Sequence, residues 1–171
     1  MMKKTAGLAT ILVSVLALTG CGASGSGAPT RNIKQVTDGV EAQSGSILIR
    51  DLLLVAQPDG SSAIVGTFIN EDATTDSLTG ITVGGIKATL SAPSYELAQN
   101  TPIIFSGDTA NATGSVVGLN AAAGTRVSVV VTFAHAAPVT LSAIVRAKSD
   151  YFANVGGAAT PAATPTPSST K

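Results

Sequence analysis

The chain has 171 residues, enough for one domain with tails, and its Lys and Arg residues balance its Asp and Glu residues to a net charge of zero. Only 12% of the residues are charged, against about 25% in a typical domain. The sequence therefore has neither the basic surface of a nucleic-acid-binding protein nor an acidic tail for a cationic partner, and its one cysteine excludes an internal disulfide.

The first residues have the pattern of a secretory signal peptide. Lys3 and Lys4 precede an apolar run of 13 residues, Ala6 to Leu18. This run is shorter than the roughly 20 residues that a membrane-spanning helix needs, and it fits the apolar region of about 7–15 residues in a signal peptide. We therefore expect residues 1–20 to be removed.

The apolar run ends at Leu18, Thr19, Gly20 and Cys21, an order that resembles the lipobox of bacterial lipoproteins. The resemblance implies a diacylglyceryl group on the thiol of Cys21, cleavage before this residue and acylation of its freed amine. One acyl chain anchors a protein only marginally, but two or three would hold it firmly at the outer face of the cytoplasmic membrane. The alternative is a buried structural cysteine that happens to end a hydrophobic segment.

Composition divides the remaining chain into one domain between two tails. Residues 21–32 are rich in Gly, Ser and Ala and predict a flexible, lipidated tether. Residues 153–171 are rich in Thr, Pro and Ala without an apolar period, which predicts a disordered tail. The prolines beside threonines leave O-glycosylation of this tail open. Residues 33–152 are expected to form the folded domain.

Short β-branched segments separated by turn residues run through this domain. Gly84 and Gly85 predict a hairpin turn, and His135–Pro138 predicts a second one. Seven to eight strands at this spacing indicate a single all-β sandwich. The expected strands are Ser46–Gln57, Ser62–Asn70, Leu78–Val83, Ile86–Ser91, Thr101–Ser106, Thr113–Leu119, Thr125–Ala134 and Val139–Ala147.

Two segments fit this pattern less simply. Leu52, Leu53 and Leu54 interrupt the alternation of the first strand, so both of its faces are expected to be partly buried, and a helical interpretation stays open. Arg31–Gln43 is the most polar part of the mature chain. It is either a strap that crosses the sandwich or an arm that adds to the sheet edge of a partner.

Two stretches resemble the periplasmic copper chaperones of the PCu(A)C type. Gly60–Val83 has the family's small-residue turn, strand ending in Asn, polar loop and Asp-x-Leu-x-Gly motif, in which Asp76 is the first residue. Gly118–Val145 matches the family's last hairpin. The layout is also similar to actinobacterial lipoproteins of the mycobacterial LpqE type, through the lipobox and the run Asp38-Gly39-Val40. These resemblances imply an immunoglobulin-like or cupredoxin-like sandwich.

The copper chemistry of these chaperones does not carry over to this chain. Cu(I) prefers thioether and imidazole ligands, which the family supplies as two His and two Met. The positions of its His-x-Met pair fall near Thr113 and Ser115, and its earlier His falls near Leu90. Both methionines lie in the signal peptide, and His135 is the single histidine. Cu(I) is therefore not an expected partner.

Two other patterns concern metals. His135 is the one candidate metal ligand, with an exposed turn residue as the alternative. Glu71, Asp72 and Asp76 form an acidic loop that either holds Ca²⁺ through its oxygens or is simply solvated.

Catalytic motifs are absent from the sequence. A serine nucleophile would have to pair with His135, and Ser44, Ser46 and Ser106 stand in no G-x-S-x-G elbow. The Gly84-Gly85 turn is not followed by the lysine of a phosphate loop. Asn111–Thr113 fits the N-glycosylation acceptor pattern.

The function expected from the sequence is non-catalytic binding outside the cytoplasm. We expect a lipid-anchored sandwich that acts as a binding or interaction module of the cell envelope, with an envelope protein as its possible partner and no cofactor besides the lipid on Cys21. The alternative is a copper-handling protein with a rebuilt metal site.

Overall fold

The structure is a computed structural model that describes residues 38–156. The predicted signal peptide, the lipobox at Cys21 and most of the two predicted tails lie outside the described residues. Within residues 38–156, no helix is long and apolar enough to cross a membrane.

The regular secondary structure of the described residues is almost entirely β, which confirms the predicted fold class. Its single helical element is η2, a short 3₁₀ turn at Asp150–Phe152. The strands are more numerous than predicted because several pieces of two or three residues pair separately. They are β1 (Val40–Ser44), β2 (Ile47–Ala56), β3 (Ser62–Asn70), β4 (Asp76–Val83), β5 (Ile86–Lys87), β6 (Thr89–Leu90), β7 (Tyr95–Leu97), β8 (Ile103–Ile104), β9 (Gly114–Val116), β10 (Arg126–Phe133) and β11 (Val139–Arg146).

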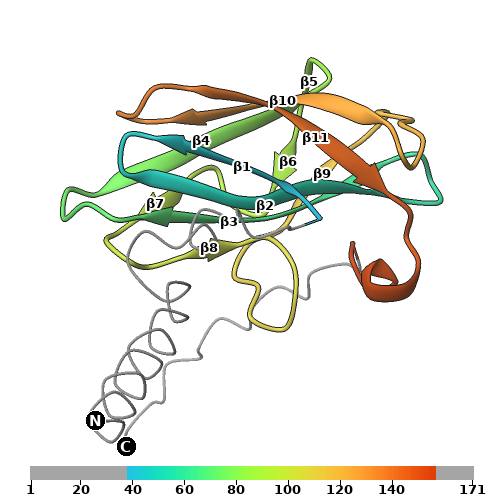
Figure 1. Ribbon diagram of the computed structural model, residues 1–171, viewed down its shortest axis with the longest axis horizontal. Coiled ribbons are helices and arrows are strands. Elements are labelled where there is room, and N and C mark those ends of the chain that lie inside the picture. The colour runs from blue at the N-terminus through green and yellow to red at the C-terminus, as the bar shows by residue number, and fades with distance from the viewer. Residues whose placement is uncertain (1–37, 157–171) are drawn as a thin grey trace, which may run out of the picture. The chain divides into compact units, whose positions relative to one another are not determined.

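The strands form two packed layers joined through β11 (Figure 1). One layer contains β4, β5, β7 and β10, and the other contains β1, β2, β3, β6, β8 and β9. β11 pairs antiparallel with β10 along most of its length, and its last residues, Val145 and Arg146, pair in parallel with Leu54 and Val55 of β2. One continuous path, β5-β4-β10-β11-β2-β3-β9-β6, therefore folds into a nearly closed sandwich.

The core lies between the layers and depends on alternation along the strands. Inward residues of β10 and β11, such as Val129, Val131 and Val145, are completely buried, while their neighbours along each strand reach the surface. Phe105 contacts Phe68 and Tyr95 edge to face, with ring centroids 5.6 and 5.5 Å apart. Edge-to-face aromatic pairs add about 0.5–1.5 kcal/mol beyond the area that they bury, so this trio anchors one end of the core.

Local sequence signals predicted several elements well. β3 has the predicted bounds, and Gly84 and Gly85 form the β4–β5 turn with φ values of 56° and 83°. Two positive φ angles in a two-residue hairpin are the geometry that favours glycine. The predicted strand Ile86–Ser91 is divided, because β5 pairs with β4 in one layer and β6 pairs with β9 in the other.

The leucine run that broke the alternation of β2 is explained by a β-bulge, which excludes the helical interpretation. Arg50 pairs with Thr67 and Leu53 with Val65, so two residues of β2 stand opposite Gly66 alone. Asp51 adopts a left-handed φ of 51°, which Asp tolerates better than most residues. The bulge moves the inward positions from Ile47 and Ile49 to Leu52 and Leu54.

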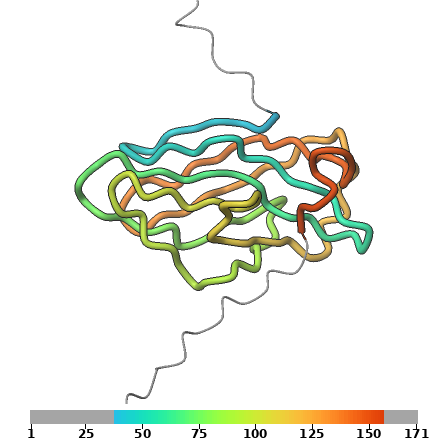
Figure 2. The backbone as a smooth tube through the Cα atoms, turned by 90° about the horizontal axis from the view of Figure 1, so that it is seen from below, coloured from blue at the N-terminus to red at the C-terminus, as the bar shows by residue number. Residues whose placement is uncertain are grey.

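The prediction that Arg31–Gln43 is a strap crossing the sandwich is wrong for its described end, which is a strand of the sheet. Residues 31–37 lie outside the described residues. Val40–Ser44 forms β1, an antiparallel neighbour of the first half of β2, and its outer position is visible in Figure 2. Gly39 lies against the bulge and donates its N–H to the carboxylate of Asp51 at 2.6 Å. Asp38 pairs with Arg146 at the end of β11. The run Asp38-Gly39-Val40 thus fastens the start of the domain to β2 and β11.

We expect Gly39→Ala to destabilise the domain. A Cβ atom on Gly39 would lie 2.3 Å from the carbonyl carbon of Asp51, and backbone cannot move aside as a flexible side chain can. Forced overpacking of this kind costs about 1–3 kcal/mol, and the change should appear in the free energy of unfolding in urea. Gly45→Ala is the comparison, because its methyl group would meet nothing within 4 Å and only its φ of 57° is unfavourable. Equal stability of Gly39→Ala and the wild type would contradict this account of the bulge.

Candidate functional site

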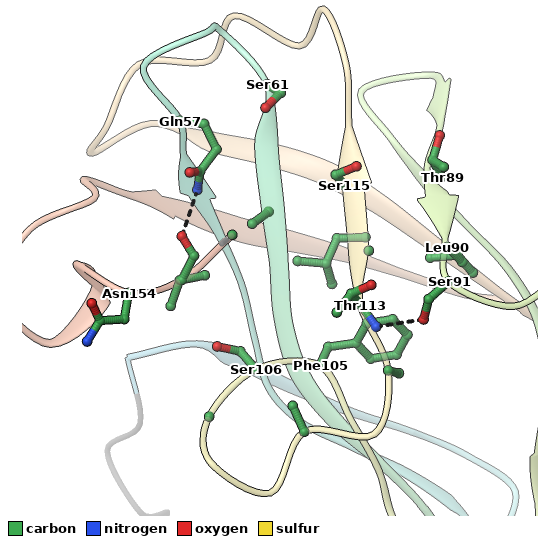
Figure 3. A pocket seen from close by; sticks show the side chains of 18 residues that line it. Gln57, Ser61, Thr89, Leu90, Ser91, Phe105, Ser106, Thr113, Ser115 and Asn154 are labelled. Atoms are coloured by element: carbon green, nitrogen blue, oxygen red, sulfur yellow. Dashed lines mark hydrogen bonds between the residues drawn. The ribbon is translucent and has the colours of Figure 1, made fainter. Parts of the chain in front are cut away.

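A cavity of about 400 Å³ lies on the outer face of the layer that contains β3, β9 and β6 (Figure 3). Its floor is formed by Ala63 and Ile64 of β3 and by Phe105. Its walls come from β6 and β9 on one side and from Asn154–Gly156 on the other. The volume falls within the range of roughly 300–1,000 Å³ typical of small-molecule sites.

The three positions that the family resemblance assigns to metal ligands all line this cavity. Thr113 and Ser115 stand beside Leu90, which contributes to the same wall (Figure 3). Their side chains are two hydroxyls and one isobutyl group, none of which is a thioether or imidazole ligand of the kind that Cu(I) prefers. Within the described residues, no group of three or more His, Cys, Asp or Glu side chains could hold a metal ion.

Several polar side chains of the cavity have unused hydrogen-bonding capacity. Among the described residues, nothing forms a hydrogen bond with the side chains of Thr89, Ser115 or Asn154. Ser91 differs, because its hydroxyl contacts the Tyr95 hydroxyl at 2.7 Å and accepts the N–H of Thr113 at 3.0 Å. The cavity thus combines a fixed polar clamp with free hydroxyl and amide groups above an apolar floor.

The loop that borders the cavity is held firmly at its base. Phe105 donates its N–H to the carbonyl of Gly66, and Asn111 bridges Ile104 and Pro102 through its amide. Ser106 has a φ of 130°, a conformation that is unfavourable for a residue with a Cβ atom. Strained residues of this kind tend to occur at ligand sites.

A second cavity of about 440 Å³ adjoins the first. Ser106, Gly107, Asn154 and Val155 line both cavities. The second is bounded by the bulge residue Asp51, by Asp108 and by the aromatic residues Tyr151 and Phe152, as well as by β3 around Gly66. Because these four residues line both cavities, we consider the two together and call them the β3 groove, between the loop 105–112 and the C-terminal turn 150–156.

The C-terminal wall of the β3 groove was missed by the sequence analysis. Its residues 153–156 fall in the predicted tail, because their composition carries no strand or helix signal. In the structure, Gln57 donates its side-chain N–H to the carbonyl of Val155 at 3.4 Å. Its side-chain oxygen accepts a hydrogen bond from the ammonium group of Lys148 at 2.8 Å. A long-range contact to a glutamine leaves no periodic pattern that could have revealed this wall.

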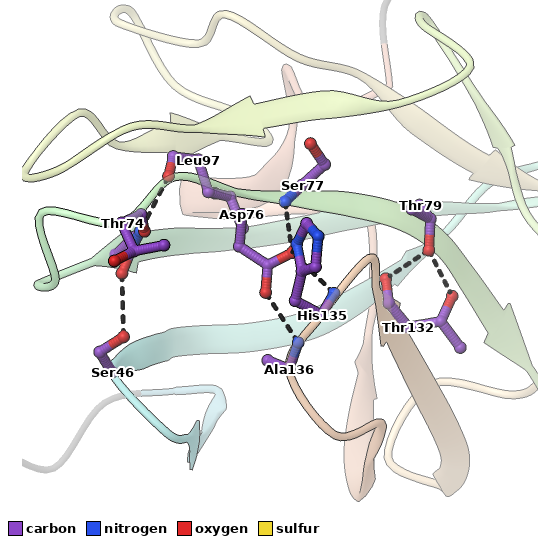
Figure 4. A network of polar contacts seen from close by, with 10 residues as sticks. Ser46, Thr74, Asp76, Ser77, Thr79, Leu97, Thr132, His135 and Ala136 are labelled. Carbon is purple, nitrogen blue, oxygen red and sulfur yellow. Dashed lines mark hydrogen bonds and ion pairs between the residues drawn. The ribbon is translucent and has the colours of Figure 1, made fainter.

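The acidic loop is divided by the structure rather than gathered into a calcium site. Glu71 and Asp72 are exposed, whereas Asp76 is buried at the start of β4. The Asp76 carboxylate accepts the backbone N–H groups of Ser77, His135 and Ala136 at 2.6, 3.0 and 2.8 Å (Figure 4). Asp76 therefore fixes the β10–β11 turn from the adjacent strand.

His135 is an exposed turn residue, and its Nδ1 lies 3.2 Å from Oδ1 of Asp76. It is not among the residues that line the β3 groove. Burial raises the pKa of Asp76, but the hydrogen bonds from Ser77, Ala136 and His135 outweigh that effect and hold the pKa below its ordinary value of 3.8. The charged form of Asp76 is thus the one that stabilises the fold.

Ser44, Ser46 and Asn111, which the sequence analysis also considered, form hydrogen bonds that hold turns and loops of the fold. The Ser44 hydroxyl donates to the carbonyl of Ala137 at 2.6 Å, on the other side of the β10–β11 turn, and Ser46 donates to Asn70. Asn70 is buried, and its amide also donates to Thr74 and Leu97, so the Asn that ends β3 organises the following loop. The amide of Asn111, the potential glycan acceptor, is occupied by the contacts that hold the groove loop.

Comparisons with known proteins identify the fold. No family model and no curated protein matches the sequence. Among solved structures, a copper-bound PCuAC domain from PmoF2 matches with a TM-score of 0.56 and 18% identity over 63% of this chain and 98% of that domain. An apo PCuAC domain from PmoF1 matches with a TM-score of 0.56 and 17% identity over 63% of this chain and 99% of that domain.

The described domain has the fold of PCuAC domains. This confirms the distant PCu(A)C similarity predicted from Gly60–Val83 and Gly118–Val145. Identities of 17–18% support the fold alone, so the ligand of the groove has to be argued from its own side chains.

We expect Asp76→Asn to reduce stability at neutral pH by about 2 kcal/mol, because hydrogen bonds to a charged group contribute about 1.5–3 kcal/mol. The folded-state pKa of Asp76 is lowered, so its contribution is present above the unfolded-state value and disappears as the pH falls through the folded-state value. The difference between wild type and variant should therefore shrink below about pH 4.

Urea unfolding at a series of pH values measures this difference. Glu96→Gln is the control, because Glu96 is exposed on β7 and has no such set of donors. A stability difference between wild type and Asp76→Asn that stayed constant from neutral to acidic pH would contradict the role of the Asp76 charge.

Proposed function

We propose that the protein is a lipid-anchored binding module on the outer face of the cytoplasmic membrane, with the β3 groove as its ligand site and no catalytic role. The lysines, the apolar run and the order Leu18-Thr19-Gly20-Cys21 support the anchor. They also support the similarity to LpqE-type lipoproteins. Residues 1–20 would be removed, and acyl chains on Cys21 would hold the domain in the envelope.

The single observation that carries the binding role is the composition of the first cavity. It lies at the positions where the resembling family has metal ligands, yet it is lined by hydroxyls, amides and small apolar groups, with no ionisable side chain among them. Free hydroxyl and amide groups above an apolar floor suit the reversible binding of a neutral ligand. The absence of an acid–base pair at this place supports a non-catalytic role.

Copper handling is the second candidate, and the similarity to a copper-bound PCuAC domain is the observation that favours it. The chain would need new ligands for this role. Cu(I) sites are built from Cys, Met and His, and outside residues 1–21 the sequence offers only His135. His135 lies in the β10–β11 turn and does not line the groove, which supports the binding module over copper handling.

We expect a soluble extract of the cell envelope to raise the melting temperature of the purified protein. A ligand present at about ten times its Kd stabilises by roughly 1.4 kcal/mol, which corresponds to a rise of about 4 °C for a domain of this size. Thr113→Lys should abolish the rise, because a long charged side chain at this position, directly before β9, would fill the groove. Thr140→Lys is the matched control on the exposed side of β11, and it should keep the rise.

The same melting measurement separates the two candidates. Copper handling predicts stabilisation by Cu(I) under reducing conditions, with loss of that effect in His135→Ala. The binding module predicts stabilisation by the extract and none by Cu(I). An extract effect that persisted in Thr113→Lys, or no extract effect at all, would contradict the assignment of the groove.

We expect Cys21→Ala to abolish lipidation. In the producing bacterium, the wild-type chain should incorporate an alkyne-labelled fatty acid and fractionate with the membrane, because the thiol of Cys21 is the acyl acceptor. The variant should carry no label and accumulate as an unprocessed precursor. Ser24→Ala, three residues further along, should behave like the wild type. Normal processing and membrane attachment of Cys21→Ala would refute the anchor.

A further inference from the structure

We infer that the β3 groove binds a neutral saccharide chain, an inference that rests on the proposed binding function and specifies its ligand. The groove is longer than either cavity, because its two cavities are neighbours that share Ser106, Gly107, Asn154 and Val155 as lining residues. A ligand that fills both would be extended along β3. A chain of a few sugar rings has that form.

The charges that line the groove disfavour anionic ligands. No Lys, Arg or His lines either cavity, while Asp51 and Asp108 line the second. Phosphates, carboxylates and nucleotides need cationic side chains or helix N-termini, and the groove has neither. A neutral ligand that donates hydrogen bonds to the carboxylates of the second cavity is compatible with both cavities of the groove.

The polar groups of the groove match the chemistry of sugar hydroxyls. A sugar hydroxyl donates one hydrogen bond and accepts others, and it needs partners of both kinds. The hydroxyls of Thr89 and Ser115 and the amide of Asn154 can donate and accept, and no other described residue forms a hydrogen bond with these side chains. In the second cavity, a carboxylate can only accept hydrogen bonds from a ligand, which suits the hydroxyl donors of a sugar, although one oxygen of Asp51 already accepts the N–H of Gly39.

The apolar parts of the groove match the other face of a sugar. Hexose rings have C–H faces between their polar edges, and these faces pack on small apolar or aromatic surfaces. Ala63, Ala110 and Ala112 provide such a surface in the first cavity. In the second, Tyr151 lies at the rim, is 89% exposed, and packs edge to face on Phe152 with centroids 5.4 Å apart. The exposed ring of Tyr151 offers an apolar face and a hydroxyl tip to a ligand in the second cavity.

The conformation of the groove loop is consistent with a site fixed in advance. Ser106 holds its unfavourable φ of 130° at the place where the two cavities meet. Phe105, the preceding residue, is buried in the core and contacts Phe68 and Tyr95. The core thus holds Ser106 where a ligand would cross from one cavity to the other.

Isothermal titration of the full chain tests this inference, with the protein in a zwitterionic detergent that has no sugar headgroup. The probes are cellohexaose, maltohexaose and chitohexaose, each up to about 10 mM to reach weak affinities. At least one should bind. Tyr151→Ala should weaken that binding about tenfold through loss of stacking, whereas Tyr151→Phe should retain it. Ser115→Ala should weaken it about threefold to tenfold.

The control variant and a peptide probe make the outcome decisive. Ser142→Ala removes an exposed hydroxyl from β11, outside the groove, and should leave the affinity unchanged. No binding of any hexasaccharide, or binding that is insensitive to both Tyr151→Ala and Ser115→Ala, would overturn the inference. So would tight binding of a synthetic peptide of residues 157–171 without saccharide binding, since it would make the groove a peptide site.

The result also separates this inference from the function on which it rests. If all three saccharides fail while the envelope extract still stabilises the wild type and not Thr113→Lys, the binding module stands and the saccharide assignment falls. If the extract also has no effect, the proposed function itself falls.

Discussion

The bulge at Asp51 and Leu52 is the constraint on which the sandwich depends. It makes β2 a strand with two different halves. Before the bulge, β2 pairs with β1, and after it β2 pairs in parallel with the end of β11. The parallel pairing joins the two layers into one path. Without the change of face at the bulge, Leu52 and Leu54 would point away from the core instead of into it.

The same bulge shapes the groove on the outer face. Gly66 stands opposite the two bulged residues, and its carbonyl accepts the N–H of Phe105, where the groove loop begins. Asp51 itself holds Gly39 through one carboxylate oxygen and lines the second cavity. One irregularity in β2 thus closes the sandwich and positions both the loop and a carboxylate of the candidate site.

Elements with local causes could be predicted from the sequence, and elements with long-range causes could not. Alternation and a Gly-Gly turn define β3 and the β4–β5 hairpin within a few residues of chain. The bulge depends on the pairing of β2 with β3 opposite Gly66, a long-range contact that the sequence of β2 alone does not show. The sequence analysis grouped Asp76 with Glu71 and Asp72 as an acidic loop. Its role in the fold could not be predicted, because two of the N–H groups that donate to its carboxylate belong to the turn at His135, far along the chain.

The candidate site was predictable in its position but not in its extent. The resemblance placed the metal-ligand positions of the copper chaperones near Leu90, Thr113 and Ser115, and the structure brings all three to one cavity. Its opposite wall at Asn154 and Tyr151 is made of residues that resemble a tail or a turn. They gain their place through Gln57 and through packing over β3, and neither contact has a sequence signature.

Strand alternation explains how one fold can carry different ligand chemistry at this place. Thr113, directly before β9, and Ser115 within it line the groove and are exposed or half-buried, while Gly114 and Val116 are buried. A Cβ atom on Gly114 would lie 3.0 Å from Ile64 and from Leu90, so the inner positions are closely constrained by packing. Thr113 and Ser115 are not among the buried core residues, so substitutions there are expected to disturb the core less. The fold therefore fixes the inner positions of this segment but not the chemistry of its outer positions, which here present two hydroxyls to the cavity.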